Sequence, residues 1–149
     1  MVSQSTTYSN PKNPDHMNGP EMAIDKDKTT KSHTVCEDGN NVWYKVAFNR
    51  EHAVKKVVLV NSFDNGYKAR MDGTVVMVLQ GGVAHTCGTV SVTSQSTEPE
   101  YSIQCNSLWG DGVTLEGEPG KQDACIHMRE IQVFETVNIG KLLTDGVIF

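Results

Sequence analysis

The sequence predicts an all-β domain, an antiparallel β-sandwich jelly roll of about eight strands. Short runs rich in β-branched and aromatic residues recur along the chain, and clusters of Gly, Pro, Asn and Asp separate them. No window keeps a helical period over several turns. The length of 149 residues suits one domain built around one core.

The expected elements follow in chain order. Residues 1–32 are rich in Ser, Thr, Asn, Pro, Lys and Asp, and this composition predicts loops with one short strand. Clear strand patterns begin at Val42, and the run Val57-Val58-Leu59-Val60 is typical of a buried strand. The predicted strands are 42–48, 54–61, 74–80, 89–93, 101–105, 112–116 and 125–135.

The end of the chain differs from the rest. The domain is expected to span 1–136, because the last predicted strand already completes it. Residues 137–149 form a C-terminal extension with its own turn at Asp145-Gly146. Two interpretations stay open for the extension, a further edge strand or the opening strand of a following repeat. No internal repeat is visible within the chain.

Composition and missing motifs exclude several classes of function. Lys and Arg number 13 against 18 Asp and Glu, a net charge of −5 that provides no basic face for duplex nucleic acid. No apolar run approaches the ~20 residues that cross a bilayer, so membrane insertion is not expected. Nucleophile-elbow, zinc-protease, phosphate-loop and dinucleotide motifs are also missing from the sequence, which predicts a protein without enzymatic activity.

The four cysteines, none of them in a CxxC pair, favour two disulfides formed in an oxidising compartment over a zinc or thioredoxin-like site. Four buried, reduced thiols are the alternative. A polar run follows Met1 where a secretory signal would be apolar, so we interpret the chain as a mature, secreted fragment starting at an added Met.

Carboxylates that could hold a hard cation occur in two places, at Asp25 and Asp27 and at Glu130. A calcium site needs six to eight oxygens, so it would form only if the fold brought the first loop against the last strand. From spacing alone, solvated carboxylates are the favoured interpretation. The five histidines also show no metal-type spacing.

Six short pieces occur in a fixed order along the chain. They are 4–8 (QSTTY), 23–25 (AID), 32–34 (SHT), 43–46 (WYKV), 57–61 (VVLVN) and 128–134 (MREIQVF). Over residues 3–135 these pieces resemble the F-type lectin family, the fucolectins, which are related to discoidin-type domains and have a galactose-binding-domain-like fold. The resemblance implies a β-sandwich jelly roll, structural Ca²⁺, no enzymatic activity and a shallow loop pocket for sugar, typically L-fucose.

The resemblance also assigns the calcium ligands and the disulfides. It places Ca²⁺ on the side chains of Asp25 and Glu130, where the ion would hold the loop that presents His33. It pairs Cys87 with Cys105, and Cys36 is then left to pair with Cys125. Backbone oxygens near Met22, Asp27, Thr30 and Arg129 complete the implied calcium ligands.

The sugar motif of the family is present only in part. His33 and Asp64 match its His and Asp, whereas Ser62 stands where the family has Arg. Lys68 and Arg70 lie on either side of the position of the second basic residue, and Arg70 would serve after a one-residue insertion.

The adjacent cysteines that many members place after the Asp are Asn65-Gly66 here. Phe63 and Tyr67 in the same loop are candidates for a replacement apolar face, although both also fit as ordinary loop anchors.

The missing Arg has a calculable effect. A charge-assisted hydrogen bond from an Arg fork contributes ~1.5–3 kcal/mol, so its loss weakens sugar binding roughly ten- to a hundredfold. Three outcomes follow from this: a shifted pocket that still takes fucose, a pocket altered for another glycan, or a fold kept for adhesion with the sugar site lost.

The resulting functional hypothesis is a secreted lectin domain that binds fucose or a related terminal glycan non-covalently and is stabilised by calcium. Because one weak site gains strength from repetition, a homo-oligomer or tandem array is expected. The alternative is a discoidin-like adhesion module that binds a protein or matrix ligand. A third hypothesis is an appended binding domain of a larger enzyme or toxin.

Overall fold

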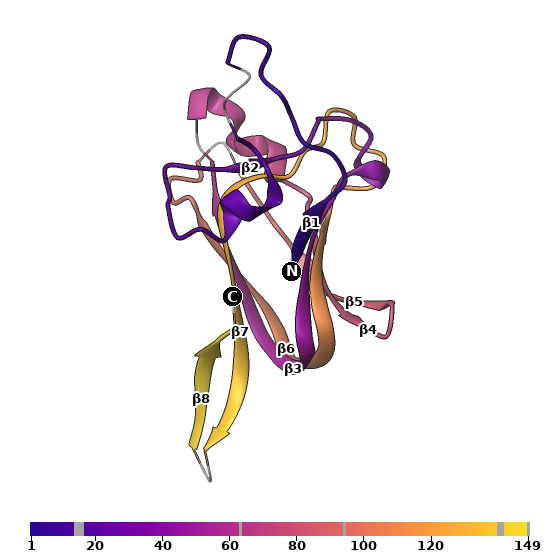
Figure 1. Cartoon of the computed structure of the whole chain (residues 1–149), viewed down its shortest axis with the longest axis vertical. Coiled ribbons are helices and arrows are strands. Elements are labelled where there is room, and N and C mark those ends of the chain that lie inside the picture. Colours follow the sequence, from indigo (N-terminus) through magenta and orange to yellow (C-terminus); the bar gives the residue numbers. More distant parts are fainter. Residues whose placement is uncertain (14–16, 63, 94, 140–141, 149) are drawn as a thin grey trace.

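Two long bent strands form the frame of the computed structural model (Figure 1). β3 (Trp43–Asn61) and β6 (Glu100–Glu116) pair antiparallel, and their register shifts between Ala47 and His52. At this shift both strands turn back, so that each contributes to both arms of the folded sheet in Figure 1. One continuous sheet therefore supplies both layers of the sandwich.

The remaining strands extend this frame on both sides. All pairings are antiparallel, in the order β2-β7-β3-β6-β4-β5, with β1 added to β3 and β8 added to β7. The structure describes residues 1–13, 17–62, 64–93, 95–139 and 142–148. The other strands are β1 (Val2–Gln4), β2 (Ser32–His33), β4 (Val75–Gln80), β5 (Val83–Thr89), β7 (His127–Ile139) and β8 (Leu142–Val147).

The predicted all-β sandwich is confirmed, with two changes to its strands. The segments expected at 42–48 and 54–61 are the two halves of β3, and those at 101–105 and 112–116 are the halves of β6. The polar residues between the halves suggested turns. The sheet instead continues there through bulges, with register shifts in the β3–β6 pairing and left-handed backbone at Asn106 and Ser107 in β6.

The strand predicted at 89–93 is wrong. The strand there is β5, which ends at Thr89 and is largely exposed, so it lacks the alternating apolar pattern that marks a half-buried strand. Val90 and Val92 are buried as loop residues, and Val90 is held by hydrogen bonds to Gly73 and Thr74. Their apolar character reflects burial in the core and not sheet pairing.

The core lies between the two arms of the folded sheet. Its members come mainly from the inward faces of the long strands, including Val46, Val57, Leu59 and Leu115, each with 0% exposure. Burying such side chains is the main favourable term in folding.

The loops gather at the end away from the strand bend, at the top of Figure 1. The helical turns in the described part of the chain are 3-10 turns, and none is long and apolar enough to cross a membrane. They are η1 (Pro20–Ala23), η2 (Gly39–Asn41) and η3 (Asp64–Met71).

Both disulfides are present as predicted. Cys87–Cys105 joins β5 to β6 within the sheet. Cys36–Cys125 joins the loop after β2 to the stretch that leads into β7. The second bond therefore ties together two segments at the loop end of the molecule.

The C-terminal extension continues the sheet. β7 runs past the expected boundary to Ile139, and β8 then pairs back against it from Phe134↔Val147 onward. β8 is thus an added strand of this sheet, and the domain boundary at 136 stays a prediction.

Candidate binding pocket and cation site

An open pocket of about 420 Å³ lies among the loops at the loop end. Four segments far apart in the sequence build it: the N-terminal loop, β2 with the residues around it, η3, and the stretch that leads into β7. The lining residues are Tyr8, Asn10, Asn18, Lys31, His33, Val35, Cys36, Tyr67, Arg70, Asp123 and His127.

His33, the last residue of β2, packs against two other rings in this pocket, both of them tilted relative to its own. Its register partner across the strand pair is His127, the first residue of β7. The ring centroid of His33 lies 4.4 Å from the ring centroid of His127 and 4.7 Å from that of Tyr8. Burial first, and then the positive charges of Arg70 and Lys31, lower the pKa of His33 to about 4. The imidazole is therefore neutral at pH 7.

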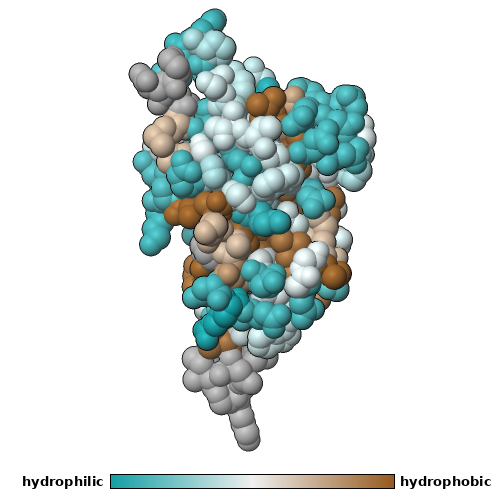
Figure 2. Space-filling view, turned by 45° about the vertical axis from the view of Figure 1, so that its right-hand side comes forward, coloured by the Kyte–Doolittle hydropathy of each residue, from teal (hydrophilic) through white to brown (hydrophobic). Residues whose placement is uncertain are grey.

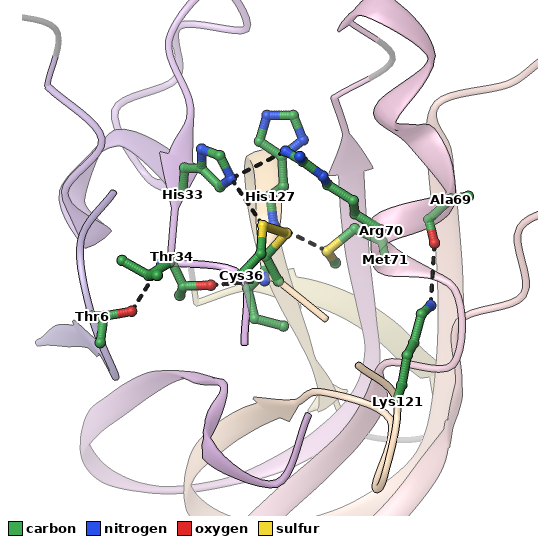
Figure 3. The surroundings of a disulfide bond; sticks show 12 residues. Thr6, His33, Thr34, Cys36, Ala69, Arg70, Met71, Lys121 and His127 are labelled. Carbon is green, nitrogen blue, oxygen red and sulfur yellow. Dashed lines mark hydrogen bonds between the residues drawn. A yellow bond between two sulfur atoms is a disulfide. The ribbon is translucent and has the colours of Figure 1, made fainter. Parts of the chain in front are cut away.

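Arg70 reaches His33 from the opposite wall. Its Nη1 donates to Nε2 of His33 at 3.5 Å, which requires the tautomer with the proton on Nδ1. Figure 3 shows the Arg70 side chain extending from its helical turn toward the two histidine rings. The ring centroid of Tyr67 lies 3.9 Å from Cζ of Arg70, a cation–π distance. The guanidinium is thus held between an aromatic face and a neutral imidazole.

The other predicted sugar-binding residues lie elsewhere or outside the description. Lys68 does not line the pocket, and its Nζ donates to the Ser96 carbonyl at 2.8 Å. Ser62 has 0% exposure. Phe63 lies outside the described residues, and Asp64 begins η3 with a side chain that is also outside the description. Of the predicted set, the fold brings His33, Tyr67 and Arg70 together in the pocket.

Several lining residues were not predicted from the sequence. Tyr8 and His127 were missed because their contact with His33 depends on pairing between distant segments, which no local pattern reports. The sequence shows a single His in each of 32–34 and 126–128, but only the pairing of these two segments brings the rings together. The other lining residues not predicted to bind sugar are Asn10, Asn18, Lys31, Val35, Cys36 and Asp123.

A second group of oxygen atoms lies in the loop that follows η1. Oδ2 of Asp25 accepts from Oγ1 of Thr30 at 2.7 Å, and Oδ1 accepts from the Asp27 backbone N–H at 2.8 Å. The Thr30 hydroxyl also lies 2.8 Å from the Asp27 carbonyl and 3.3 Å from the Met22 carbonyl. The loop oxygens that the resemblance named therefore surround one hydroxyl.

Glu130, on β7, adjoins this group. Its side chain is 4% exposed, and its Oε1 is buried without a hydrogen-bond partner. Burial, followed by the neighbouring Asp25 carboxylate, raises the pKa of Glu130. Arg129 connects the same strand to the loop, since its Nη1 donates to the Lys28 carbonyl at 2.5 Å.

These oxygens fit a hard cation. Two carboxylates from distant segments lie side by side, one of their oxygens is buried and unsatisfied, and backbone carbonyls lie close by. Such a donor set is what Ca²⁺ prefers.

A third cluster does not fit a metal. His33, Cys36 and Cys125 place their donor atoms within 4.8 Å of one another, but both sulfurs belong to a disulfide and are not available as ligands.

Comparisons with known proteins identify the fold. No family model matches the sequence, and no curated protein matches it. Solved structures do match. The lectin domain of lectinolysin complexed with Lewis B antigen has a TM-score of 0.72 and 20% identity, over 92% of this chain and 93% of that one.

Two further matches extend the comparison. A fucolectin from striped bass (Morone saxatilis) serum has a TM-score of 0.74 and 16% identity, over 92% of this chain and 45% of that one. An F5/8 type C domain from Bacteroides fragilis has a TM-score of 0.66 and 16% identity, over 91% and 90%. The chain shares the fold of these lectin and F5/8 type C domains.

Proposed function

We propose that this chain is a calcium-stabilised carbohydrate-binding domain that binds a fucosylated glycan without catalysing a reaction. One observation carries the proposal: His33 and Arg70, which come from segments far apart in the sequence, meet at 3.5 Å inside an open pocket. The pocket volume of about 420 Å³ lies within the range of small-ligand sites.

The pocket chemistry suits a sugar. The Arg70 guanidinium offers paired N–H donors to neighbouring hydroxyl oxygens, and the neutral His33 imidazole can exchange hydrogen bonds with a third. Tyr67, 46% exposed, and Tyr8, 37% exposed, add aromatic surface for the C–H faces of a sugar ring. Arg70 would serve as the second basic residue of the family's motif, whereas Ser62, which stands in place of the arginine, is buried and does not line the pocket.

The matched structures support the choice of ligand. The lectin domain of lectinolysin was solved with Lewis B antigen, and the striped bass protein is named a fucolectin. Fucosylated glycans are therefore the first ligands to test on this chain.

Calcium is proposed to have a structural role. Asp25 and Glu130 would bind the ion through their carboxylates, with Met22, Asp27, Thr30 and Arg129 supplying nearby oxygens. Bound Ca²⁺ would neutralise the two adjacent carboxylates and satisfy the buried oxygen of Glu130. Its effect would be to hold the loop 22–30 against β7, the strand on which β2 and His33 are paired.

We also propose an extracellular location and display in several copies. Two disulfides persist in oxidising compartments, and repeated weak sites raise the strength of glycan binding.

A glycan array run with and without calcium tests the function. We expect His33→Ala and Arg70→Ala each to weaken the binding of fucosylated glycans by about tenfold or more, since each removes a hydrogen-bonding group from the site. His85→Ala and Arg50→Ala are matched controls, because both residues are exposed and neither lines the pocket.

Two outcomes would contradict the proposal. One is glycan binding that both pocket variants retain. The other is a wild-type chain that binds no glycan but does bind a matrix protein, and this result would favour the adhesion module.

A further inference from the structure

We propose that the Cys36–Cys125 disulfide is part of the ligand-contacting surface of the pocket, so that glycan binding is sensitive to thiol reductants. Cys36 would be the residue of the pair that touches the ligand. This inference rests on the proposed glycan-binding function, which it deepens by naming a further binding element.

The two sulfurs of this bond have different surroundings. Cys36 is half-buried and lines the pocket, whereas Cys125 is 1% exposed. One half of the disulfide therefore faces the cavity and the other half belongs to the interior.

Cys36 also lies beside the polar groups of the site. Its Sγ is 3.9 Å from Nε2 of His33, the same nitrogen that Arg70 approaches to 3.5 Å. In Figure 3 the disulfide lies close to the rings of His33 and His127 and to the Arg70 side chain. A ligand group that hydrogen-bonds to Nε2 of His33 from the side of Cys36 comes within the ~4 Å contact distance of the sulfur.

The sulfur provides an apolar contact for a sugar beside the polar groups of His33 and Arg70. A disulfide sulfur is polarisable and only weakly polar, so it packs well against C–H groups. Val35 lies beside it in sequence and also lines the pocket, which makes this wall the apolar complement to Arg70.

The fold does not depend on this bond alone. Glu37 and Ala124 exchange backbone hydrogen bonds at 3.0 and 2.9 Å beside the disulfide. The Thr34 backbone N–H donates to the Ile126 carbonyl at 3.0 Å, and Oγ1 of Thr34 accepts from the Ile126 backbone N–H at 3.0 Å. These four hydrogen bonds keep the two segments paired when the disulfide opens, so its reduction is expected to change the pocket before it unfolds the domain.

The second disulfide of the molecule serves as an internal control for the reduction experiment. Cys87–Cys105 joins two strands of the sheet, and neither of its cysteines lines the pocket. A ligand bound around His33 has no contact with that bond. The two disulfides therefore separate a contact effect from a general stabilising effect.

Dithiothreitol supplies both electrons for the reduction of the disulfide and is itself oxidised. One thiolate of the reagent attacks Sγ of Cys36, the S–S bond breaks, and Cys125 leaves as a thiolate that takes up a proton. The second thiol of the reagent then displaces Cys36 from the mixed disulfide. The products are two protein thiols and the oxidised cyclic reagent.

The experiment measures the reduction rate of each bond in the full chain, with and without a saturating probe. Lewis b oligosaccharide is the first probe and L-fucose the second. Timed samples are alkylated, and mass spectrometry gives the remaining fraction of each disulfide. We expect the probe to slow reduction of Cys36–Cys125 severalfold and to leave the rate for Cys87–Cys105 unchanged.

Binding by paired variants is the second measurement. C36S/C125S should bind the probe about tenfold or more weakly, while C87S/C105S keeps wild-type affinity. If C36S/C125S fails to fold, the rate measurement on the wild-type chain decides the question by itself.

The outcomes separate the two proposals. Equal slowing of both bonds, or slowing of neither, would overturn this inference, and the function would still stand if His33→Ala abolished binding. Binding of neither probe by the wild-type chain would overturn the function and this inference together.

Discussion

The strand body and the loop end of this molecule are stabilised in different ways. In the body, Val57, Leu59, Leu115 and Val133 have 0% exposure and pack between the two arms of the sheet. Residues 1–32 contribute one buried apolar side chain among those described, Ala23. Figure 2 shows the same contrast, with a mostly hydrophilic surface at the top and larger hydrophobic areas across the middle.

The loop end depends instead on individual contacts. A disulfide, ring–ring contacts, short side-chain hydrogen bonds and a proposed cation hold its segments together. A change in the body should therefore destabilise the whole domain. A change at the loop end should alter binding or the response to cation and pH, with a smaller effect on the fold.

The largest effect is expected from Leu59→Ala in the body. Leu59 is 0% exposed on β3, and truncating a buried leucine costs about 2–5 kcal/mol through lost burial and the cavity left behind. Urea unfolding of the purified variant measures this as a lower midpoint. Val83→Ala is the matched control, because Val83 is 59% exposed and its loss should leave the midpoint within error. Equal midpoints for Leu59→Ala and the wild type would remove the distinction between the two regions.

The next largest effect is expected from calcium removal at the loop end. A ligand at a hundredfold excess over its dissociation constant stabilises a fold by ~2.7 kcal/mol, so EDTA should lower the thermal midpoint by several degrees. Asp25→Asn should abolish most of this difference, while the exposed control Glu98→Gln keeps it. A wild-type midpoint that EDTA does not change would count against the calcium site.

Taken over one pH unit, the smallest effect is expected from acid, and it tests the comparison at one residue. Because the pKa of His33 is about 4 in the fold and 6.5 in the unfolded chain, only the unfolded chain takes up this proton between those pH values. Stability therefore falls as the pH falls from 6.5 to about 4, by up to ~1.4 kcal/mol per pH unit.

His33→Gln tests this pH dependence. The variant should lose less stability than the wild type over the same pH interval, as measured by urea midpoints at stepped pH. His85→Gln, an exposed change on β5, should keep the wild-type slope. Parallel slopes for the wild type and His33→Gln would show that the His33 ring does not titrate as its surroundings imply.

Much of the body could be predicted from local patterns. The run 57–60 marks a buried strand because burial on both faces demands continuous apolar residues. The prediction failed at 89–93, where two buried valines belong to a loop and the exposed β5 carries no apolar pattern. Hydrophobic patterns report burial, and they identify a strand only when the burial comes from a sheet face.

The site was predictable only in part. Asp25 and Glu130 came together as the resemblance to F-type lectins implied, and His33 and Arg70 share a pocket. Tyr8, His127 and Cys36 were missed as pocket residues, since their positions depend on how β2, β7 and the N-terminal loop pack.

By itself, the sequence determined the all-β class, the strand-rich body and the residue types available for binding, because strand patterning and turn chemistry are local properties of the chain. Tertiary structure alone decided which side chains meet. It packed His33 against His127, turned Cys36 toward the cavity and left an oxygen of Glu130 buried beside Asp25. These contacts join residues separated by many tens of positions, and the free energy that selects them comes from packing the whole sheet.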